Sequence, residues 1–409
     1  MTTEQTAEKL PAGKVLANIV NDVYREAAEA KERGEMIGWC ASNFPQEIPT
    51  TLGLHTVYPE SQAAAISAKG GSLPLLEHAE GELGFSNDLC AYARISMAYA
   101  DTGKCPNGEM DMPLPDFVLC CNNICTCMMS WYENLGRKLN IPVIMIDVPY
   151  CDSYNVDQKR IDYVKGQFVD AIHQLEEITG KKWDDKKFEE VCAYSNRTGE
   201  AWLEATTYMG YKPSPLNGFE LFNHMAVATM ARGHEGAAEA MEQLCEEYRQ
   251  NVAEGKSNFR AEEKHRIMFE GIACWPYLRA TSKPLKESGT NVTACVYGPS
   301  FAFTYRNLDE LAEAYCGVPN AINLERATEL RKQLCVDGKV DGGIVHINRS
   351  CKMWSGIAPE MGRRISADLN IPVVTFDGDQ SDPRNFSEEQ YKTRIEGLVE
   401  IMDSKKEGK

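Results

Sequence analysis

Four cysteines lie within eight residues of this chain, at Cys120, Cys121, Cys125 and Cys127. A thiolate can act as a nucleophile or bind a soft metal, so the position of each thiol decides what it can do. Cys120 and Cys121 end the apolar run "DFVLCC", which predicts a buried strand with both thiols in the core. Cys127 lies roughly 200° from Cys125 around a helix, which predicts a structural role for it. Cys125 is therefore the candidate ligand of this group.

Two further cysteines occupy positions like that of Cys125. Cys351 follows an apolar strand and precedes an amphipathic helix, and Cys90 follows the turn-rich "FSND" before a helical run. The amides and the dipole at a helix N-terminus favour a thiolate. Three such thiolates from separate segments suit a cuboidal iron–sulfur cluster with one iron left open. Core packing and zinc binding are the alternatives for these thiols.

The elements that position these cysteines occur twice. Residues 115–149 and 340–379 each read as a strand, a junction with Cys, an amphipathic helix, the shared "LNIPV" and a second strand that runs into Asp. Residues 36–60 and 267–299 match in the same way upstream. Two copies of one unit, each a β-α-β segment followed by a second β-α-β segment, predict parallel sheets, whose ligands bind beyond the carboxyl ends of the strands.

We therefore expect an α/β protein with two similar Rossmann-like or flavodoxin-like parallel-sheet domains and a helical insertion between them. The expected boundaries are residues 1–155 for an N-terminal α/β domain with a helical arm, 156–262 for the helical region and 263–409 for the C-terminal α/β domain. At 409 residues the chain is long enough for more than one hydrophobic core.

Composition narrows the function classes. A formal net charge of −17 argues against nucleic acid and anionic membranes as partners. The sequence shows neither an export signal nor an apolar run that could span a bilayer, so we expect a cytoplasmic protein whose fifteen cysteines are reduced. Walker and G-x-G-x-x-G loops are absent, which argues against ATP or dinucleotide binding by those routes.

With these segments in view, the chain resembles the α subunits of the 2-hydroxyacyl-CoA dehydratases. The resemblance is carried over nearly the whole length by "GWCASNFPQE", "VYPESQAA", "DLCAYAR", "MPLPDFVLCCNNIC", "WYEN", "KPSPLNGFELFNHMA", "HRIMFEGIACWP", "VHINRSCK" and "FDGDQSDPRNF". Within that family, "CCNNICTCM", "FAFTYRNLDELAEAYC" and "KMWSGIAPEM" are most similar to the (R)-2-hydroxyglutaryl-CoA enzyme.

The resemblance implies a heterodimer with a homologous β subunit, each subunit holding a [4Fe–4S] cluster through three cysteines. Here those ligands would be Cys90, Cys125 and Cys351, and the fourth iron would stay open. It also implies a separate ATP-hydrolysing iron–sulfur activator that supplies one electron. The sequence leaves open whether a flavin accompanies the complex.

The implied reaction removes water from a 2-hydroxyacyl thioester through a ketyl radical, giving (E)-glutaconyl-CoA if the substrate is (R)-2-hydroxyglutaryl-CoA. Glu60 would be the base or handle the hydroxide, with a structural carboxylate as the alternative. Ser42 would hydrogen-bond the reacting oxygen, with an N-cap near Phe44 as the alternative. Arg94 and Arg349 flank two of the ligand cysteines and could moderate the charge of the cluster.

Two departures bear on these expectations. Cys40 stands where the family usually has Ser, which adds a thiol near the site. The segment from Asp101 to Met112 is short for a hydroxyglutaryl-CoA enzyme, so phenyllactyl-, 2-hydroxyisocaproyl- and lactoyl-CoA are alternative substrates. The side-chain pocket depends on which residues of the middle helices and of "YGPSFAF" (297–303) line it. An aryl-CoA reductase subunit and a non-catalytic scaffold subunit are the alternative functions.

Overall fold

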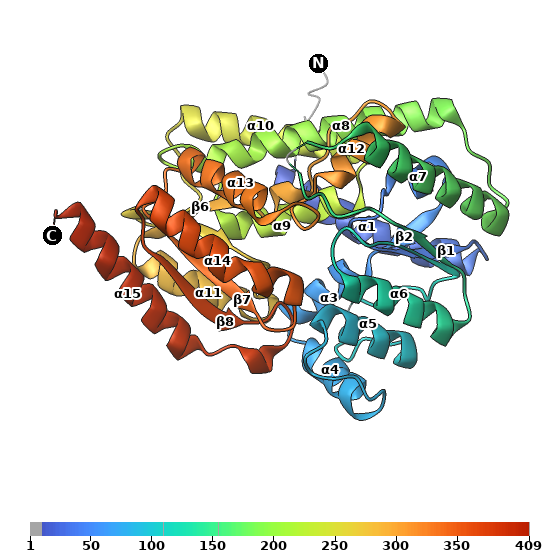
Figure 1. Ribbon diagram of the computed structural model, residues 1–409, viewed down its shortest axis with the longest axis horizontal. Helices are drawn as coiled ribbons and strands as arrows, with labels where there is room; N and C mark the ends of the chain where they lie inside the picture. Colours follow the sequence, from blue (N-terminus) through green and yellow to red (C-terminus); the bar gives the residue numbers. More distant parts are fainter. Residues whose placement is uncertain (1–9, 109, 154, 409) are drawn as a thin grey trace, which may run out of the picture.

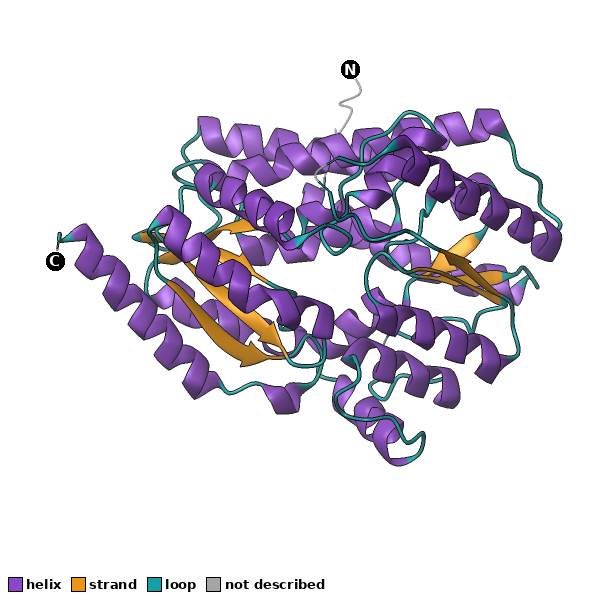
Figure 2. Cartoon of the chain, viewed as in Figure 1, coloured by secondary structure: helices purple, strands orange, loops and turns teal. Residues whose placement is uncertain are grey.

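The computed structural model describes residues 10–108, 110–153 and 155–408, and its strands form two parallel sheets of four strands each (Figures 1 and 2). The strands of the first sheet are β1 (Ile37–Cys40), β2 (His55–Val57), β3 (Phe117–Cys121) and β4 (Val143–Ile146). Those of the second sheet are β5 (His265–Glu270), β6 (Thr290–Cys295), β7 (Gly342–Asn348) and β8 (Val373–Gly378). Every residue of β1, β3, β5 and β6 is buried, as expected for parallel strands covered on both faces.

The two sheets share one topology. Their strand orders are β2-β1-β3-β4 and β6-β5-β7-β8, and both begin the flavodoxin-like order. Asp116 and Asp341 occupy equivalent positions before β3 and β7, and each carboxylate accepts the backbone N–H of the neighbouring strand's first residues, Ile37 and Arg266. The expected α/β class and its internal duplication are therefore confirmed.

The shared "LNIPV" has a structural reason. Asn140 and Asn370 each end the helix that follows the cysteine junction, and both have a φ of 53°. Asn tolerates this left-handed conformation better than most residues, so it can turn the chain from helix to strand at both places. Each helix then leads directly into the outer strand of its sheet, β4 or β8.

Helices surround both sheets. Those of the first half are α1 (Ala12–Glu32), α2 (Glu47–Thr51), α3 (Pro59–Ala68), α4 (Ser72–Gly81), α5 (Ala91–Thr102) and α6 (Thr126–Leu139). Those of the second half are α11 (Leu278–Glu287), α12 (Leu308–Cys316), α13 (Leu324–Asp337), α14 (Lys352–Leu369) and α15 (Glu388–Lys406). Short 3₁₀ turns lie at η1 (Tyr208–Gly210), η2 (Trp275–Tyr277), η3 (Pro299–Phe301) and η4 (Pro383–Asn385).

The middle of the chain is helical, as the sequence predicts. It contains α7 (Gln158–Thr179), α8 (Asp185–Thr207), α9 (Gly218–Met230) and α10 (Glu235–Ala253), of which α8 and α10 pack against each other along one edge of the molecule (Figure 1). The side chains of Asp157, Asp184 and Asn217 accept backbone N–H groups at the starts of α7, α8 and α9. These caps set where three of the four helices begin.

The predicted domain boundaries at residues 155 and 262 stay a prediction. Helices on one side of a boundary pack against elements on the other side. Helix α12 of the second half packs on α7, and its Leu311 and Tyr315 belong to the core around the first sheet. Helix α1 packs on α9 and α10. Residues 1–9 of the predicted N-terminal arm lie outside the described residues. Among the helices that the structure describes, none combines the length and apolar character that crossing a membrane requires.

Candidate functional site

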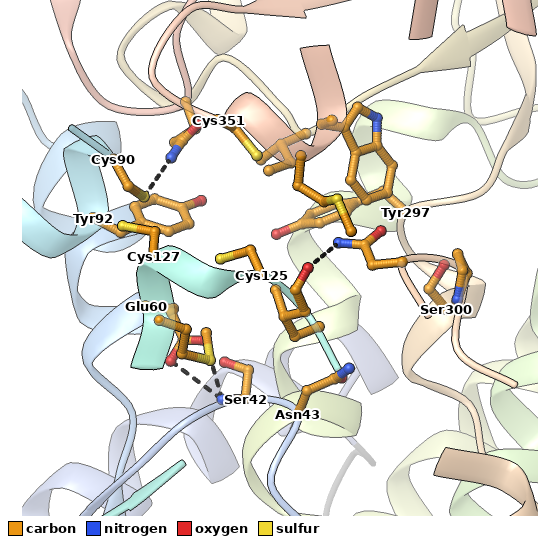
Figure 3. A pocket seen from close by; sticks show the side chains of 18 of the residues that line it. Ser42, Asn43, Glu60, Cys90, Tyr92, Cys125, Cys127, Tyr297, Ser300 and Cys351 are labelled. Atoms are coloured by element: carbon orange, nitrogen blue, oxygen red, sulfur yellow. Dashed lines mark hydrogen bonds between the residues drawn. The ribbon is translucent and has the colours of Figure 1, made fainter. Parts of the chain in front are cut away.

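A cavity lies where the carboxyl ends of the two sheets face each other. Seven of its lining residues follow strand ends by two to four positions: Ser42 after β1, Glu60 after β2, Cys125 after β3, Ile272 after β5, Tyr297 after β6, Cys351 after β7 and Gln380 after β8. Both halves therefore contribute to one site, as open parallel sheets predict. We call it the thiol cavity, because Cys90, Cys125, Cys127 and Cys351 all line it (Figure 3).

Three of these thiols stand at the starts of helices. Cys90, Cys125 and Cys351 occupy the N-cap positions of α5, α6 and α14, with non-helical backbone angles. Burial raises the pKa of Cys125 and of Cys351 to about 12, against a lowering contribution from backbone N–H groups of the first helical turn. The structure thus brings the three cysteines selected from the sequence to one cavity, each at the positive end of a helix.

Cys127 is not where the sequence predicts it. It lines the thiol cavity, and a hydrogen bond between its thiol and that of Cys90 lowers the pKa of Cys127 and raises that of Cys90. The helical angle of 200° does not apply, because Cys125 has the extended angles φ −168° and ψ 161° and only the next residue begins α6. The expectation that Cys127 points about 200° away from Cys125 is therefore wrong, whereas its structural role stays a prediction.

The other cysteines near the motif lie in the core. Cys120 and Cys121 are fully buried in β3, which confirms the prediction for both. Cys121 donates to the backbone carbonyl of Asn43 over 2.9 Å. Cys40 is fully buried in β1 and is not among the residues that line the thiol cavity. Burial raises the pKa of these three thiols, so they behave as small apolar side chains.

Glu60 and Ser42 lie together on one wall of the thiol cavity (Figure 3). The backbone N–H of Ser42 lies 3.2 Å from each carboxylate oxygen of Glu60, and the hydroxyl of Tyr132 donates to Oε2 over 3.3 Å. Burial raises the pKa of Glu60 to about 7, and these donors lower it again in part. Ser42 is not an N-cap, since α2 begins at Glu47 behind Gln46.

The two arginines near the cysteines do not reach the cavity. Arg94 is fully buried and pairs with Glu80 and with Asp382, at 3.1 Å from the latter. Arg349 is exposed, with its guanidinium 3.7 Å from Asp377. Neither residue lines the thiol cavity, so the expectation that they moderate charge there receives no support from their positions.

Sequence reasoning missed Gln380 and Tyr92, whereas Tyr297 belongs to the segment "YGPSFAF", on which the sequence predicted that the side-chain pocket depends. Gln380 follows β8, and its side-chain amide donates to Cys90 Sγ over 3.3 Å. Tyr92 and Tyr297 hydrogen-bond each other in the cavity wall. Gln380 could have been found from the duplication, since it follows β8 as Cys351 follows β7. Tyr92 had no such signal, because its position depends on how α5 meets the second half.

The candidate metal ligands in the thiol cavity are soft thiols. Among the described residues, no group of three or more His, Cys, Asp and Glu is arranged to hold a single ion. Soft thiols from three helix starts are nevertheless the ligands that iron–sulfur clusters use. The indole N–H groups of Trp131 and Trp354, which belong to residues lining the cavity, find no acceptor in the described chain.

Fold and site together define a two-sheet α/β protein with a thiol-lined cavity between its halves. Residues 41–402 match the family model described as "2-hydroxyglutaryl-CoA dehydratase, D-component". The chain therefore belongs to this family, whose members are dehydratases and thus carbon–oxygen lyases.

Three relatives are similar along almost the whole chain. The (R)-phenyllactyl-CoA dehydratase alpha subunit of Clostridium sporogenes is 56% identical, and the alignment covers 96% of each chain. The (R)-2-hydroxyisocaproyl-CoA dehydratase alpha subunit of Clostridioides difficile is 48% identical, covering 98% of each. The (R)-2-hydroxyglutaryl-CoA dehydratase subunit alpha of Acidaminococcus fermentans is 46% identical, also covering 98% of each.

Proposed function

We propose that this chain is the α subunit of a radical dehydratase that eliminates water from an (R)-2-hydroxyacyl-CoA. The observation that carries the proposal is the convergence of three cysteines at helix N-cap positions and one partly buried carboxyl group, from both halves of the chain, on a single cavity. Its partners would be a homologous β subunit and an ATP-hydrolysing iron–sulfur activator.

Cys90, Cys125 and Cys351 would hold a [4Fe–4S] cluster by their thiolates. When bound, such a cluster supplies a single electron and a Lewis-acidic iron. Three ligands leave one iron without a protein thiolate. Gln380 would donate a hydrogen bond to the Cys90 sulfur, as it does here.

The elimination takes hydroxide from the α carbon of the thioester and a proton from the β carbon, so that water and an enoyl thioester leave. The β proton is not acidic in the substrate itself, which is why the proposed route passes through a ketyl radical of the substrate. The electron is returned at the end, so the overall reaction is redox-neutral.

Glu60 would remove the β proton or receive the hydroxide. A carboxyl with a pKa of about 7 is half ionised at neutral pH, which suits a base that must also pass its proton on. Ser42 would donate its hydroxyl to the substrate oxygen, and its backbone N–H orients Glu60. The apolar walls, including Trp131 and Phe301, would exclude water from the reactive species.

Four acyl groups are candidates for the acyl part of the substrate. The sequence pattern favours (R)-2-hydroxyglutaryl-CoA, with (E)-glutaconyl-CoA as its product, over phenyllactyl-, 2-hydroxyisocaproyl- and lactoyl-CoA. The three relatives act on three different members of this set, so family membership alone does not choose among them.

Metal analysis tests the cluster directly. The chain is co-purified anaerobically with its β subunit, and iron, zinc and acid-labile sulfide are measured for the parent, Cys125→Ala and the control Cys192→Ala. Cys192 is buried in α8 and does not line the thiol cavity. We expect about eight irons per heterodimer in the parent and control and roughly half in Cys125→Ala. If the parent complex contains little iron, or contains zinc whose amount Cys125→Ala does not change, the cluster is contradicted and the chain is a non-catalytic scaffold subunit.

A further inference from the structure

A second cavity lies behind the wall that carries Glu60. Ser42, Glu60, Tyr92, Tyr297 and Phe301 line both this cavity and the thiol cavity. Beyond the shared wall, residues of α1, α3 and α9 and the turn at η2 enclose the second cavity. We call it the apolar cavity. Glu60 therefore stands at the junction of two spaces, one with thiols and one without.

Aromatic and aliphatic side chains dominate the apolar cavity. The ring of Phe222 packs edge-on against Trp275 and Tyr297, with centroid distances of 6.0 and 6.3 Å. The indole N–H of Trp275 donates to the hydroxyl of Tyr92, which fixes the shared wall. Apart from Glu60, helix α3 lines the cavity with small side chains, among them Ala65, so the space is kept open there. Rings and thioethers of this kind favour contact with an apolar or aromatic group.

The charged side chains that line the two cavities also bear on which acyl side chain can bind. Among the described residues that line either cavity, none is Lys, Arg or His, and Glu60 is the one carboxyl group. A substrate whose acyl side chain ends in a carboxylate would have to bury that charge close to Glu60, where no cationic side chain lines either cavity. Burial of an unpaired carboxylate is strongly unfavourable, and repulsion by a like charge adds to this cost.

We infer that the apolar cavity binds the acyl side chain and that this side chain is uncharged and apolar or aromatic. The inference rests on the proposed function. If Glu60 removes the β proton, the thioester lies on the thiol side of Glu60 and the atoms beyond the β carbon lie on the other side. The CoA arm then leaves on the thiol side of Glu60.

The first test compares three thioesters on the complete system of chain, β subunit and reduced activator. The probes are (R)-phenyllactyl-CoA, (R)-2-hydroxyglutaryl-CoA and (R)-lactoyl-CoA, the last of which has nothing beyond its β carbon. We expect kcat/KM for phenyllactyl-CoA to exceed that for 2-hydroxyglutaryl-CoA by at least about tenfold. A preference for 2-hydroxyglutaryl-CoA would overturn the inference and leave the proposed function intact, whereas no dehydration of any probe would contradict the proposed function itself.

The second test fills the apolar cavity. Ala65→Leu on α3 and Ala226→Leu on α9 add the same side chain from two different walls. Each is expected to lower kcat/KM for phenyllactyl-CoA by roughly tenfold or more and to leave lactoyl-CoA within about twofold. The matched control is Ala28→Leu, at an exposed position of α1 that does not line the cavity, which should change neither value.

Binding gives a readout that does not depend on turnover. Calorimetry on the heterodimer without activator would compare the products cinnamoyl-CoA and acryloyl-CoA. Ala65→Leu should weaken the binding of cinnamoyl-CoA by about tenfold and should change the binding of acryloyl-CoA little. Equal weakening of both products would mean that the apolar cavity holds the CoA arm, and would overturn the assignment. If Ala65→Leu fails to fold, Ala226→Leu carries the same comparison.

Discussion

Burial dominates the acid–base behaviour of Glu60. Four donors around its carboxylate, the backbone N–H groups of Ser42 and of Glu60 itself and the hydroxyls of Tyr132 and Ser42, lower its pKa, yet desolvation outweighs them and the result is a value of about 7. The thiols around it respond to the same surroundings, since burial also raises the pKa of Cys125 and Cys351. The site is therefore one in which charge is costly unless a bound group supplies a counter-charge.

The activity of the complex should depend on the ionisation of Glu60. As a base it must be deprotonated, so we expect kcat/KM to rise with pH through about 7 and then to level off. Glu60→Gln should lower kcat by about 100-fold or more and abolish this rise. pH–rate profiles of parent and variant check this. A Gln variant that keeps the rise would show that another group titrates.

The same pKa affects stability. Because Glu60 ionises at a higher pH in the folded chain, the stability that it contributes is fully present below about pH 4.5 and is lost as the pH rises through about 7. Glu60→Gln cannot ionise, so its free energy of unfolding should gain on that of the parent between about pH 5 and pH 8. Urea unfolding at both pH values checks this. Glu310→Gln, whose carboxylate has a lowered pKa through Arg306, should show no such gain.

Cys127 offers a sharp test of which thiols are ligands. It contacts Cys90 but is not at a helix N-cap, whereas Cys90, Cys125 and Cys351 are. We expect Cys127→Ala to keep its iron and sulfide and Cys90→Ala to lose roughly all of the iron of this subunit. Metal analysis of the anaerobic complex distinguishes them. If Cys127→Ala loses iron and Cys90→Ala keeps it, Cys127 rather than Cys90 is the ligand.

At the scale of elements, close helix packing holds the walls of the site in place. Helix α8 approaches the segment after η3 at Gly199, where an added Cβ would lie 2.2 Å from the carbonyl oxygen of Phe303. That segment continues from Ser300 and Phe301, which line the thiol cavity. Backbone cannot move aside as a flexible side chain can, so glycine is required at this contact.

Two glycine substitutions should therefore act in opposite directions. Gly199→Ala should destabilise the chain by about 1–3 kcal/mol, because the methyl group meets backbone. Gly166→Ala in α7 has nothing within 4 Å of the added methyl group and should stabilise by about 0.5–1 kcal/mol through helix propensity. Chemical denaturation of the two variants measures both. Equal effects would mean that Phe303 yields to the methyl group.

At the scale of the whole molecule, the two halves are joined directly beside the thiol cavity. The backbone N–H of Ala91 donates to the hydroxyl of Ser350 over 3.1 Å, next to Cys90 and Cys351 respectively. Arg94 spans the same junction, where it binds the Leu89 carbonyl and the carboxylate of Asp382. These contacts fix the distance between cysteines that lie more than 250 residues apart.

Loss of the Arg94 contacts should weaken this junction. Arg94→Met leaves buried Asp382 with fewer partners, so we expect a loss of about 3 kcal/mol in the free energy of unfolding. The control Arg306→Met removes an exposed pair with Glu310 and should change stability little. Denaturant unfolding compares them. An Arg94→Met variant as stable as the control would show that Arg384, which also pairs with Asp382, suffices.

The sequence by itself determined the elements and most of the site. Apolar runs, helix periodicity and the repeated "LNIPV" are local, so they predict two copies of a unit with two β-α-β segments and place Cys125 and Cys351 at helix starts. Only the tertiary structure decided that Cys127 enters the cavity, that Arg94 does not, and that Tyr92, Tyr297 and Gln380 join Glu60 there. The position of Cys127 depends on the extended backbone of Cys125 before α6, and the other outcomes depend on how the two halves pack. Contacts between segments distant in the chain leave no pattern that a single sequence reveals.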